Sequence, residues 1–372
     1  MKLSEDLIKK ISAERLEPDW MLDIRVRAFN KWKKMAEPHW AGIDYEPIDY
    51  DNLNYFNNPS KIDNNDLAAA YKKMGIPESE QKALLGMAVD TVIDSKSVHT
   101  SYTEELNRLG IIFLPFSEAV QKHPDLVREY FGSSVPIDDN FFAVLNTAVF
   151  SDGTFVYIPE NVKCPIDLAS YFRIETARIG QFERTLIIAD KGAELSYMEG
   201  CSAPRRPNHQ LHSGVVEVIV KDSARVKYAT VQNWADNIYN FVTKRAKVES
   251  NAKMFWTQVE IGSAKTWKYP SSVLYGEGAF SDFYSLSITK GVQQADTGTR
   301  MIHIGPNTKS NIVSFGVADG EPEQTFRSMV RFHNRGAVSA CKCESKIIGK
   351  GARANTVPVF VGTEGNFTHE AT

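Results

Sequence analysis

The sequence has little cysteine and no long hydrophobic run. Its 372 residues include four cysteines, Cys164, Cys201, Cys341 and Cys343. The N-terminal segment lacks the apolar core of a signal peptide, so these few thiols indicate a reducing compartment and free cysteines instead of a disulfide framework. No apolar stretch approaches the roughly 20 residues that a membrane-spanning helix needs. We therefore expect a cytoplasmic protein with no membrane partner.

The sequence also lacks an excess of charge of one sign and any phosphate-binding motif. It contains 43 Lys and Arg against 46 Asp and Glu, for a net charge of -3. This balance is not that of a nucleic-acid binder. The glycine-rich patterns of nucleotide-binding loops and of serine hydrolases do not occur. We predict no nucleic-acid partner and no ATP binding by this chain itself.

The periodicity of apolar residues changes near residue 150. Before that point, helical spacing predicts helices over 3–16, 23–35, 64–76, 77–87 and 117–132, with a polar connector over 43–66. After it, short alternating runs bounded by Gly, Asn, Asp and Ser predict strands, as in 154–159, 184–190, 215–220 and 283–289. The sequence thus predicts an α-rich, mixed N-terminal domain over 1–150 and a mainly β domain over 151–372.

Turn residues recur about every 30 residues in the second half. A small residue followed by Ala or Thr precedes a strand at positions 192, 223, 251, 278, 307 and 336, in steps of 31, 28, 27, 29 and 29 residues. Such a period favours a solenoid in which each coil stacks on the next, and a parallel β-helix fits better than a propeller, whose blades need about 40 residues. A large β-sandwich with irregular hairpins is the alternative.

The cysteines are the first candidates for chemistry. Cys341 and Cys343 lie two positions apart on a predicted strand, so both thiols face the same way. Two thiolates cannot close a tetrahedral metal site, and a pair of small core residues is an equal alternative. Cys201 stands between Gly200 and Ala203-Pro204, which predicts a turn and a rather exposed thiol, although a structural cysteine is again the alternative. Cys164, before a proline, is interpreted as structural.

Histidines give weaker signals. His209 and His212 have metal-like spacing, but they lie in a predicted loop, where that spacing loses its meaning. His369 and Glu370 are adjacent, and both side chains can bind iron or zinc. Neighbours on a strand face opposite ways, so we expect at most one of the two in any site.

Several segments resemble the SufB/SufD family of iron–sulfur cluster assembly proteins, and in particular its SufB scaffold branch. They include "GQFERTLIIADKGAELSYMEGCSAP" (180–204), "WTQVEIGSAKTWKYPSSVL" (256–274), "QQADTGTRMIHIGPNTKS" (293–310) and "HEAT" (369–372). The resemblance extends over essentially the whole chain. It implies a helical and mixed N-terminal domain before a β-helix core. It also implies a scaffold and not an enzyme, which accepts persulfide sulfur and iron and passes the nascent cluster to apo-proteins.

The resemblance also implies roles for individual residues. Cys201 matches the family's sulfur-accepting cysteine, and Cys343, in "KCES", matches its second important cysteine. His369 and Glu370 match a pair of proposed iron or cluster ligands. Further matches are polar residues that line the interior of the β-helix between the two cysteines: Arg173, Thr230 and Lys244. The resemblance gives Cys341 no role, and Glu175 stands where the family commonly has Asn.

The cargo and partners follow from the same resemblance. It implies a transient iron–sulfur cluster and raises reduced flavin as a further cofactor. It implies a complex with the SufC ATPase and with SufD, and sulfur delivery by a cysteine desulfurase with its carrier. Family members continue past the "HEA" motif with helices that dock SufC. Because this sequence ends at Thr372, we expect weak or absent SufC binding and mobile His369 and Glu370 side chains.

Two other functions remain open from the sequence. A β-helix enzyme acting on polysaccharide would carry a ladder of Asp residues, and no such ladder is obvious here. A SufD-like structural subunit would need no cluster. Cys201 and the set Cys343, His369 and Glu370 argue against that second alternative.

Overall fold

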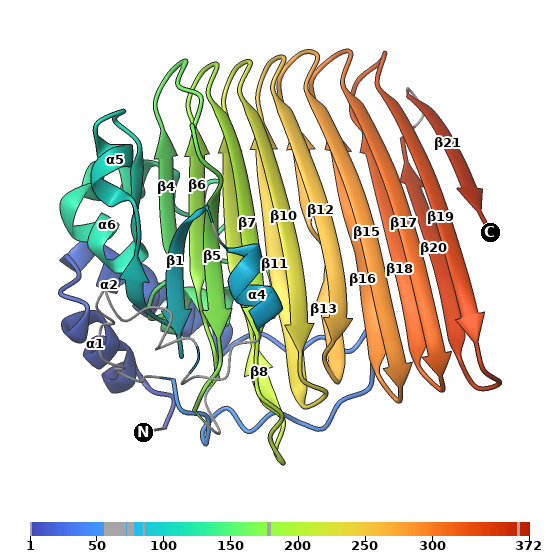
Figure 1. The fold of residues 1–372 in the computed structure, drawn as a ribbon, viewed down its shortest axis with the longest axis horizontal. Coiled ribbons are helices and arrows are strands. Elements are labelled where there is room, and N and C mark those ends of the chain that lie inside the picture. The colour runs from blue at the N-terminus through green and yellow to red at the C-terminus, as the bar shows by residue number, and fades with distance from the viewer. Residues whose placement is uncertain (1, 56–71, 73–77, 85, 177–179, 363–364) are drawn as a thin grey trace.

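Two long, mainly parallel β-sheets dominate the fold (Figure 1). The computed structural model describes residues 2–55, 72, 78–84, 86–176, 180–362 and 365–372. From β6 onwards the chain alternates between the two sheets, so each coil adds a parallel strand to both. The predicted class, mainly β with an α-rich N-terminal region and a parallel β-solenoid core, is confirmed.

The first sheet has ten strands in the order β2-β1-β5-β7-β10-β12-β15-β17-β19-β21. All neighbours pair in parallel except β1 with β2. In sheet order the strands are β2 (Lys96–Thr100), β1 (Ala88–Ile93), β5 (Leu168–Arg173), β7 (Glu194–Ser202), β10 (Arg225–Trp234), β12 (Lys253–Gly262), β15 (Phe280–Gly291), β17 (Lys309–Gly320), β19 (Val338–Ile348) and β21 (Asn366–Ala371).

The second sheet runs β20-β18-β16-β13-β11-β9-β6-β4-β3, with β8 and β14 alongside β11. Its strands are β20 (Arg353–Val361), β18 (Glu323–Phe332), β16 (Gln294–His303), β13 (Lys265–Lys268), β14 (Ser271–Leu274), β11 (Ile238–Val248), β9 (Val215–Val220), β8 (Gln210–His212), β6 (Arg184–Ala189), β4 (Thr154–Ile158) and β3 (Ile112–Pro115). One hydrophobic cluster fills part of the space between the two sheets.

The turn positions found in the sequence have left-handed backbone. All six have a positive φ: Gly192 (67°), Ser223 (62°), Asn251 (57°), Gly278 (66°), Asn307 (56°) and Gly336 (77°). Successive turns are also hydrogen bonded, as in the Ser223 N–H that donates to the Ser250 carbonyl at 2.8 Å. Gly, Asn and Ser recur because each coil must reverse at the same place in a conformation that bulky or branched residues avoid.

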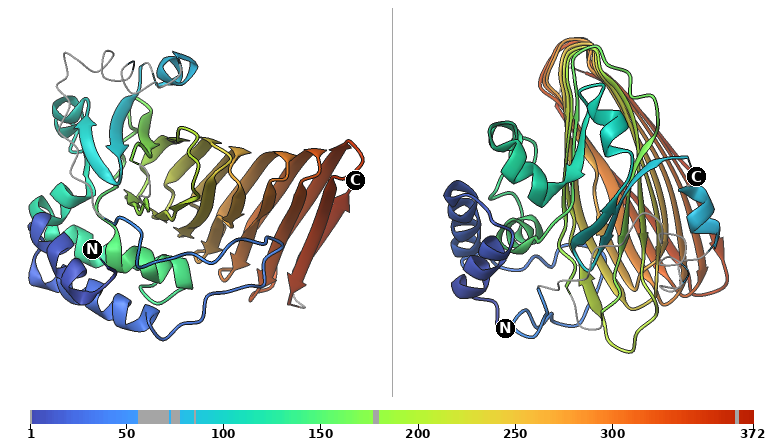
Figure 2. Two further views of the ribbon diagram at one scale, coloured as in Figure 1. Left: turned by 90° about the horizontal axis from the view of Figure 1, so that it is seen from below. Right: turned by 60° about the vertical axis from the view of Figure 1, so that its left-hand side comes forward.

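The helices gather at the N-terminal end of the solenoid (Figure 2). They are α1 (Glu5–Glu14), α2 (Asp19–Trp32), α4 (Glu78–Ala83), α5 (Thr103–Asn107), α6 (Phe116–Lys122), α7 (Pro124–Tyr130) and α8 (Phe141–Val149). A second hydrophobic cluster joins helix residues such as Phe29 and Phe142 to outward residues of the second sheet, including Leu186 and Phe241. Among the described residues, none of the helices has the length and hydropathy that crossing a bilayer would require.

The polar connector that follows α2 runs along the outside of the second sheet (Figure 2). The backbone N–H of Gly42 donates to Asp296 at 2.5 Å, and that of Asp44 donates to Gln294 at 2.8 Å. Trp40 meets Trp267 edge to face, with 5.0 Å between the ring centroids. This part of the predicted connector is extended. Residues 56–71 and 73–77, and with them most of the helix predicted over 64–76, lie outside the described residues.

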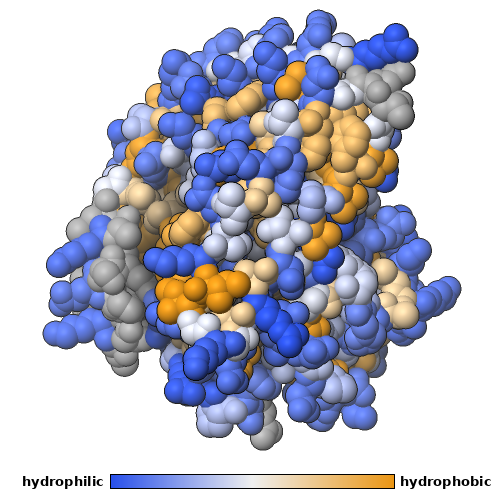
Figure 3. Space-filling view, turned by 90° about the vertical axis from the view of Figure 1, so that its right-hand side faces the viewer, coloured by the Kyte–Doolittle hydropathy of each residue, from blue (hydrophilic) through white to orange (hydrophobic). Residues whose placement is uncertain are grey.

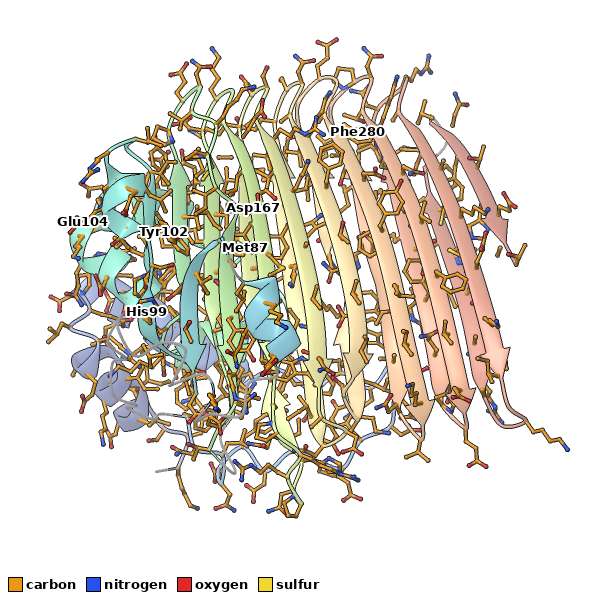
Figure 4. The ribbon with its side chains drawn as sticks, in the orientation of Figure 1. Met87, His99, Tyr102, Glu104, Asp167 and Phe280 are labelled. Carbon is orange, nitrogen blue, oxygen red and sulfur yellow. The ribbon has the colours of Figure 1, made fainter. Side chains whose placement is uncertain are left out.

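The N-terminal region contains more strand than the sequence indicated. β1 pairs in parallel with β5, and β3 pairs with β4, so residues before 150 extend both solenoid sheets. Figure 4 shows the close approach of Met87 and Asp167 at the start of β1 and β5, where the Ala88 N–H donates to the Asp167 carbonyl at 3.0 Å. The division into domains at residue 150 therefore stays a prediction.

Equivalent turns should respond oppositely to substitution, depending on the residue present. Gly278→Ala adds a Cβ 2.9 Å from the Asn251 side-chain oxygen at a left-handed position, so we expect a loss of about 1–2 kcal/mol of stability. Ser223→Gly removes left-handed strain and should gain up to about 1 kcal/mol. Urea unfolding followed by circular dichroism measures both, and equal effects of the two changes would contradict this account of the turns.

Candidate functional site

The inner face of the first sheet carries two polar rows that run along the solenoid. Parallel pairing in register places equivalent residues of successive coils side by side. The first row consists of Glu199, Thr230, Gln258, Ser285, Ser314 and Cys343. The second consists of Cys201, Gln232, Glu260, Ser287, Gly316 and Ser345. Five strand spacings of about 4.8 Å separate β7 from β19, so Cys201 and Cys343 lie about 24 Å apart along these rows.

An apolar row lies directly beside the polar ones. It consists of Tyr197, Tyr228, Trp256, Phe283, Ile312 and Cys341. These side chains belong to the hydrophobic cluster between the sheets. Cys341 thus ends the apolar row and Cys343 ends the first polar row beside it. On the far side of the apolar row, buried hydroxyl groups follow at Ser281, Ser310 and Ser339.

Cys201 lies on β7, inside the solenoid, with 3% of its surface exposed. The expectation of an exposed thiol at a turn is wrong, because β7 continues to Ser202 and the alternation of the strand turns residue 201 inwards. Burial raises the pKa of the Cys201 thiol well above its ordinary value, and the nearby Glu199 carboxylate raises it further.

A buried ion pair lies beside Cys201. The Lys244 ammonium, on β11, donates to Glu199 Oε1 at 2.7 Å and to Thr230 Oγ1 at 2.8 Å. Burial lowers the pKa of Lys244 to about 8, although the Glu199 carboxylate acts in the opposite direction and raises it. Burial alone would raise the pKa of Glu199, but Lys244 and Lys268 outweigh it and lower this pKa to about 2. Lys244 and Thr230, both expected inside the solenoid, are thus in one hydrogen-bonded group with a carboxylate that the sequence did not single out.

A second chain of buried polar groups reaches the Cys201 sulfur from the other sheet. His212 contacts Glu183 through Nε2 and Asn240 Oδ1 through Nδ1 at 2.7 Å. Asn240 Nδ2 donates to Gln232 Oε1 at 2.7 Å, which leaves the Gln232 amide to donate towards Cys201 Sγ at 3.8 Å. Burial would lower the pKa of His212, but the Glu183 carboxylate outweighs it and raises this pKa. The sequence offered only spacing for His212, which could not reveal these contacts.

Arg173 lies on β5, next to the strand of Cys201. Its side chain is buried, donates to Ser202 Oγ at 3.0 Å and pairs with Glu175. Glu175 is the residue that departs from the pattern of the resembling family. In this chain the departure places a carboxylate against the guanidinium, so the positive charge of Arg173 is largely neutralised locally.

The far end of the polar rows holds two thiols and an imidazole. Cys341 Sγ and Cys343 Sγ are 3.6 Å apart, and one donor atom each from Cys341, Cys343 and His369 lies within 4.8 Å of the others. His369 joins because β21 pairs with β19, with His369 opposite Cys341. The hydrogen bond from Cys343 lowers the pKa of Cys341, and the same contact raises the pKa of Cys343.

Glu370 points away from this group. It lies opposite Lys342, on the outer face of β19, and its charge contributes to a raised Lys342 pKa after the nearer Glu344. The structure thus brings Cys343 and His369 together, adds Cys341, and does not bring Glu370 to them. Figure 3 shows this end of the solenoid, where exposed apolar side chains also gather: Ile347, Val359, Phe360 and Val361.

Two thiolates and an imidazole are a donor set for iron or zinc with a coordination position left open. The fold and the site thus define a class of protein: a parallel β-solenoid with two interior rows of polar side chains. The buried Cys201 thiol lies at one end of these rows, and a cysteine–histidine group lies at the other. Family models match nearly the whole chain: the SufBD protein N-terminal region at residues 3–168, and the SufBD core domain of SUF-system FeS cluster assembly at residues 172–372. The chain belongs to the SufBD family of iron–sulfur cluster assembly proteins.

Curated relatives agree with this family. An iron–sulfur cluster assembly SufBD family protein of Synechocystis is 49% identical over 99% of this chain and 81% of its own length. A chloroplastic member from Arabidopsis thaliana is 46% identical over 96% of this chain and 67% of its own. A member from Staphylococcus epidermidis is 42% identical over 96% of this chain and 78% of its own length. The polysaccharide-enzyme alternative is therefore set aside.

The reactivity of Cys201 should depend on the Glu199–Lys244 pair. In a chain with the other three cysteines replaced by serine, Glu199→Gln removes a charge that raises the Cys201 pKa, so alkylation by iodoacetamide at pH 8 should accelerate about tenfold. Lys244→Met removes a charge that lowers this pKa and should slow the reaction. Glu194→Gln, on the outer face of the same strand, is the control. Equal rates in all four chains would rule out this electrostatic coupling.

Proposed function

We propose that this chain is a SufB-type scaffold on which iron–sulfur clusters are assembled from persulfide sulfur and iron and then passed to apo-proteins. The observation that supports it best is the pair of polar rows that connect Cys201 with Cys343 inside the solenoid. Burying carboxylate, ammonium and amide groups costs free energy that stability alone does not explain. We propose that Cys201 accepts sulfur and that the interior rows, with Thr230 and Lys244, line its route. Arg173 lies in register with Ser202 and not with Cys201, on the side of β7 away from β10, so its place on that route stays a sequence-based prediction.

The cysteine–histidine group supports assembly of the cluster at the other end. Thiolate binds iron tightly, and imidazole is a more readily exchanged ligand, so a mixed set suits a cluster that must be released. We propose Cys343 and His369 as ligands of the nascent cluster. Glu370 stays a sequence-based prediction, since it would have to turn around the edge of β21 to reach the same cluster.

The SufB branch is favoured over a purely structural SufD-like subunit by the two thiol sites at either end of the polar rows. The SufC ATPase, SufD, and a cysteine desulfurase with its carrier are the partners we propose on the strength of the family. A cytoplasmic location and the use of reduced flavin likewise stay predictions. The Arabidopsis relative is named as chloroplastic, so the compartment differs within the family.

Replacement of Cys201 tests sulfur acceptance. Cys201→Ser should abolish persulfide transfer from a cysteine desulfurase, because no thiol remains at the start of the polar rows. Cys164→Ser, a half-buried thiol outside those rows, is the matched control and should accept sulfur normally. Transfer is followed with radiolabelled cysteine, and circular dichroism checks the fold. Normal labelling of the Cys201→Ser chain would contradict the proposed role.

Replacements on β21 test the ligand set. Anaerobic reconstitution with iron and sulfide should give the absorption of an iron–sulfur cluster, and His369→Ala should reduce the bound iron several-fold because it removes an inward ligand. Glu370→Gln is the neighbouring control and should retain more cluster than His369→Ala, since its side chain faces outwards. If Glu370→Gln loses the cluster and His369→Ala keeps it, the sequence-based assignment holds and the proposed geometry is wrong.

A further inference from the structure

Cys341 has no role in the function proposed above, yet it is the nearest thiol to Cys343. The two sulfurs are 3.6 Å apart, both side chains are buried, and both project from the same face of β19. Cys341 completes the apolar row, where its partners in register are Ile312 and His369. An aliphatic side chain would fill that position as well, so packing does not explain a thiol there.

We propose that Cys341 and Cys343 act as a dithiol that reduces persulfide sulfur to sulfide. This activity rests on the proposed function, because persulfide is the source of sulfur in it. Cys343 carries the persulfide and Cys341 is the resolving thiol. The product of the step is the inorganic sulfide that an iron–sulfur cluster contains.

The step balances within the chain. Cys341 Sγ attacks Cys343 Sγ, a Cys341–Cys343 disulfide bond forms, and the bond between Cys343 Sγ and the outer sulfur breaks. The electron pair of the broken bond leaves with the outer sulfur, which departs with its own hydrogen and the Cys341 proton as hydrogen sulfide. The outer sulfur is reduced by two electrons, and the two cysteines are oxidised to the disulfide. A dithiol reductant then restores both thiols by exchange.

The bond requires the backbone of β19 to bend locally. Residues two apart on a strand have Cα atoms about 6.6 Å apart, at the upper end of the range of about 4.4–6.8 Å that disulfides span. Their parallel side chains keep the Cβ atoms about as far apart, whereas a disulfide needs about 3.5–4.5 Å, so β19 must bend between Cys341 and Cys343. A disulfide at the limit of this range is strained and easily reduced, as a reaction that must be repeated requires.

The surroundings of Cys343 accommodate the leaving sulfur. A small cavity of about 10 Å³, which has room for roughly one water-sized molecule, adjoins Cys343 and is lined by hydroxyl and amide groups that include Ser287, Ser314 and Gln324. Gln324 reaches across from the second sheet to Ser287 Oγ, at 2.8 Å, through the space left by Gly316, where a Cβ would lie 2.2 Å from Gln324 Oε1. The departing sulfide thus enters a polar space and not the apolar row.

The surroundings of Cys201 differ in this respect. Its sulfur contacts a carboxylate oxygen of Glu199 at 3.7 Å and the amide nitrogen of Gln232 at 3.8 Å. Neither group is a nucleophile towards sulfur. A persulfide on Cys201 would therefore be held, whereas one on Cys343 has a thiol at hand to cleave it.

The test uses the full chain with Cys164→Ser and Cys201→Ser, which leaves Cys341 and Cys343 as its two thiols. The chain is treated briefly and anaerobically with limiting inorganic polysulfide, freed of unreacted reagent and of the sulfide that loading releases, and then quenched at intervals with iodoacetamide. We expect one disulfide for each persulfide loaded, seen by intact mass without alkylation of either cysteine, and one equivalent of sulfide per disulfide released after the reagent is removed.

Two further replacements separate the roles of the thiols. With Cys341→Ser added, the persulfide should form on Cys343 and persist, and sulfide release should slow roughly tenfold or more because the intramolecular nucleophile is gone. With Cys343→Ser instead, the remaining thiol should likewise hold its persulfide. Circular dichroism checks that both chains are folded. Sulfide release at the parent rate from either single-thiol chain, or no disulfide in the parent, would overturn the proposal.

Sulfide supplied directly needs no reduction by the dithiol. Comparing sulfide with a desulfurase as sulfur source therefore separates a failure of the dithiol proposal from a failure of the scaffold function. Wild-type chain and Cys341→Ser are reconstituted with iron and either sodium sulfide or a desulfurase as sulfur source, with a small, fixed amount of a dithiol reductant that restores the Cys341–Cys343 pair. Cys341→Ser should build more cluster from sulfide than from the desulfurase, and wild type should use both. Failure of both chains with sulfide would overturn the scaffold function alone. Equal use of the two sources by Cys341→Ser would overturn the dithiol alone.

Discussion

Parallel stacking in register is the constraint on which the rest of this structure depends. Because every coil adds one strand to each sheet at a fixed register, a residue on one coil lies beside its equivalent on the next. Polar or reactive side chains at equivalent positions of successive coils therefore form a straight row along the solenoid. This is how a thiol on β7 and a thiol on β19, 142 positions apart in the sequence, come to lie on adjoining rows of the same interior face.

The polar rows are tolerated because their charges are paired and the apolar row lies beside them. Glu199 pairs with Lys244 and Glu260 with Lys268, so each buried carboxylate has an ammonium within hydrogen-bonding distance. A buried pair of this kind contributes little net stability, since desolvation offsets most of the attraction. The aromatic side chains of the neighbouring row, including Tyr228 and Trp256, supply the favourable burial instead. The apolar row thus contributes most of the stability, and the polar rows carry the groups that could take part in chemistry.

Much of the fold could be predicted from local sequence signals. The positive-φ turns require Gly, Asn or Ser, and so they are visible as a period near 30 residues. Strand alternation correctly placed Cys341 and Cys343 on one face, and His369 and Glu370 on opposite faces. Helix α8 was not predicted, because it is buried on all sides and its sequence has no amphipathic period.

The site was less predictable because its contacts depend on register between distant strands. Cys201 looked like a turn residue from its glycine and proline neighbours, but pairing with β10 keeps it in the sheet and turns it inwards. Glu199, Gln232 and Asn240 carry no motif; they matter only because register and the opposite sheet bring them to Cys201. Cys341 drew attention through spacing alone, and its contact with His369 needed the pairing of β19 with β21.

The position of Cys341 and Cys343 at the division between rows imposes an order on the proposed chemistry. A sulfur atom in a disulfide is no longer a thiolate and cannot bind iron as one. Release of sulfide and capture of iron at Cys343 therefore cannot be simultaneous. Sulfide would be produced first, and reduction of the disulfide would then free the Cys343 thiolate beside His369 for iron. On this argument the reductant that resets the dithiol controls when the metal site becomes available.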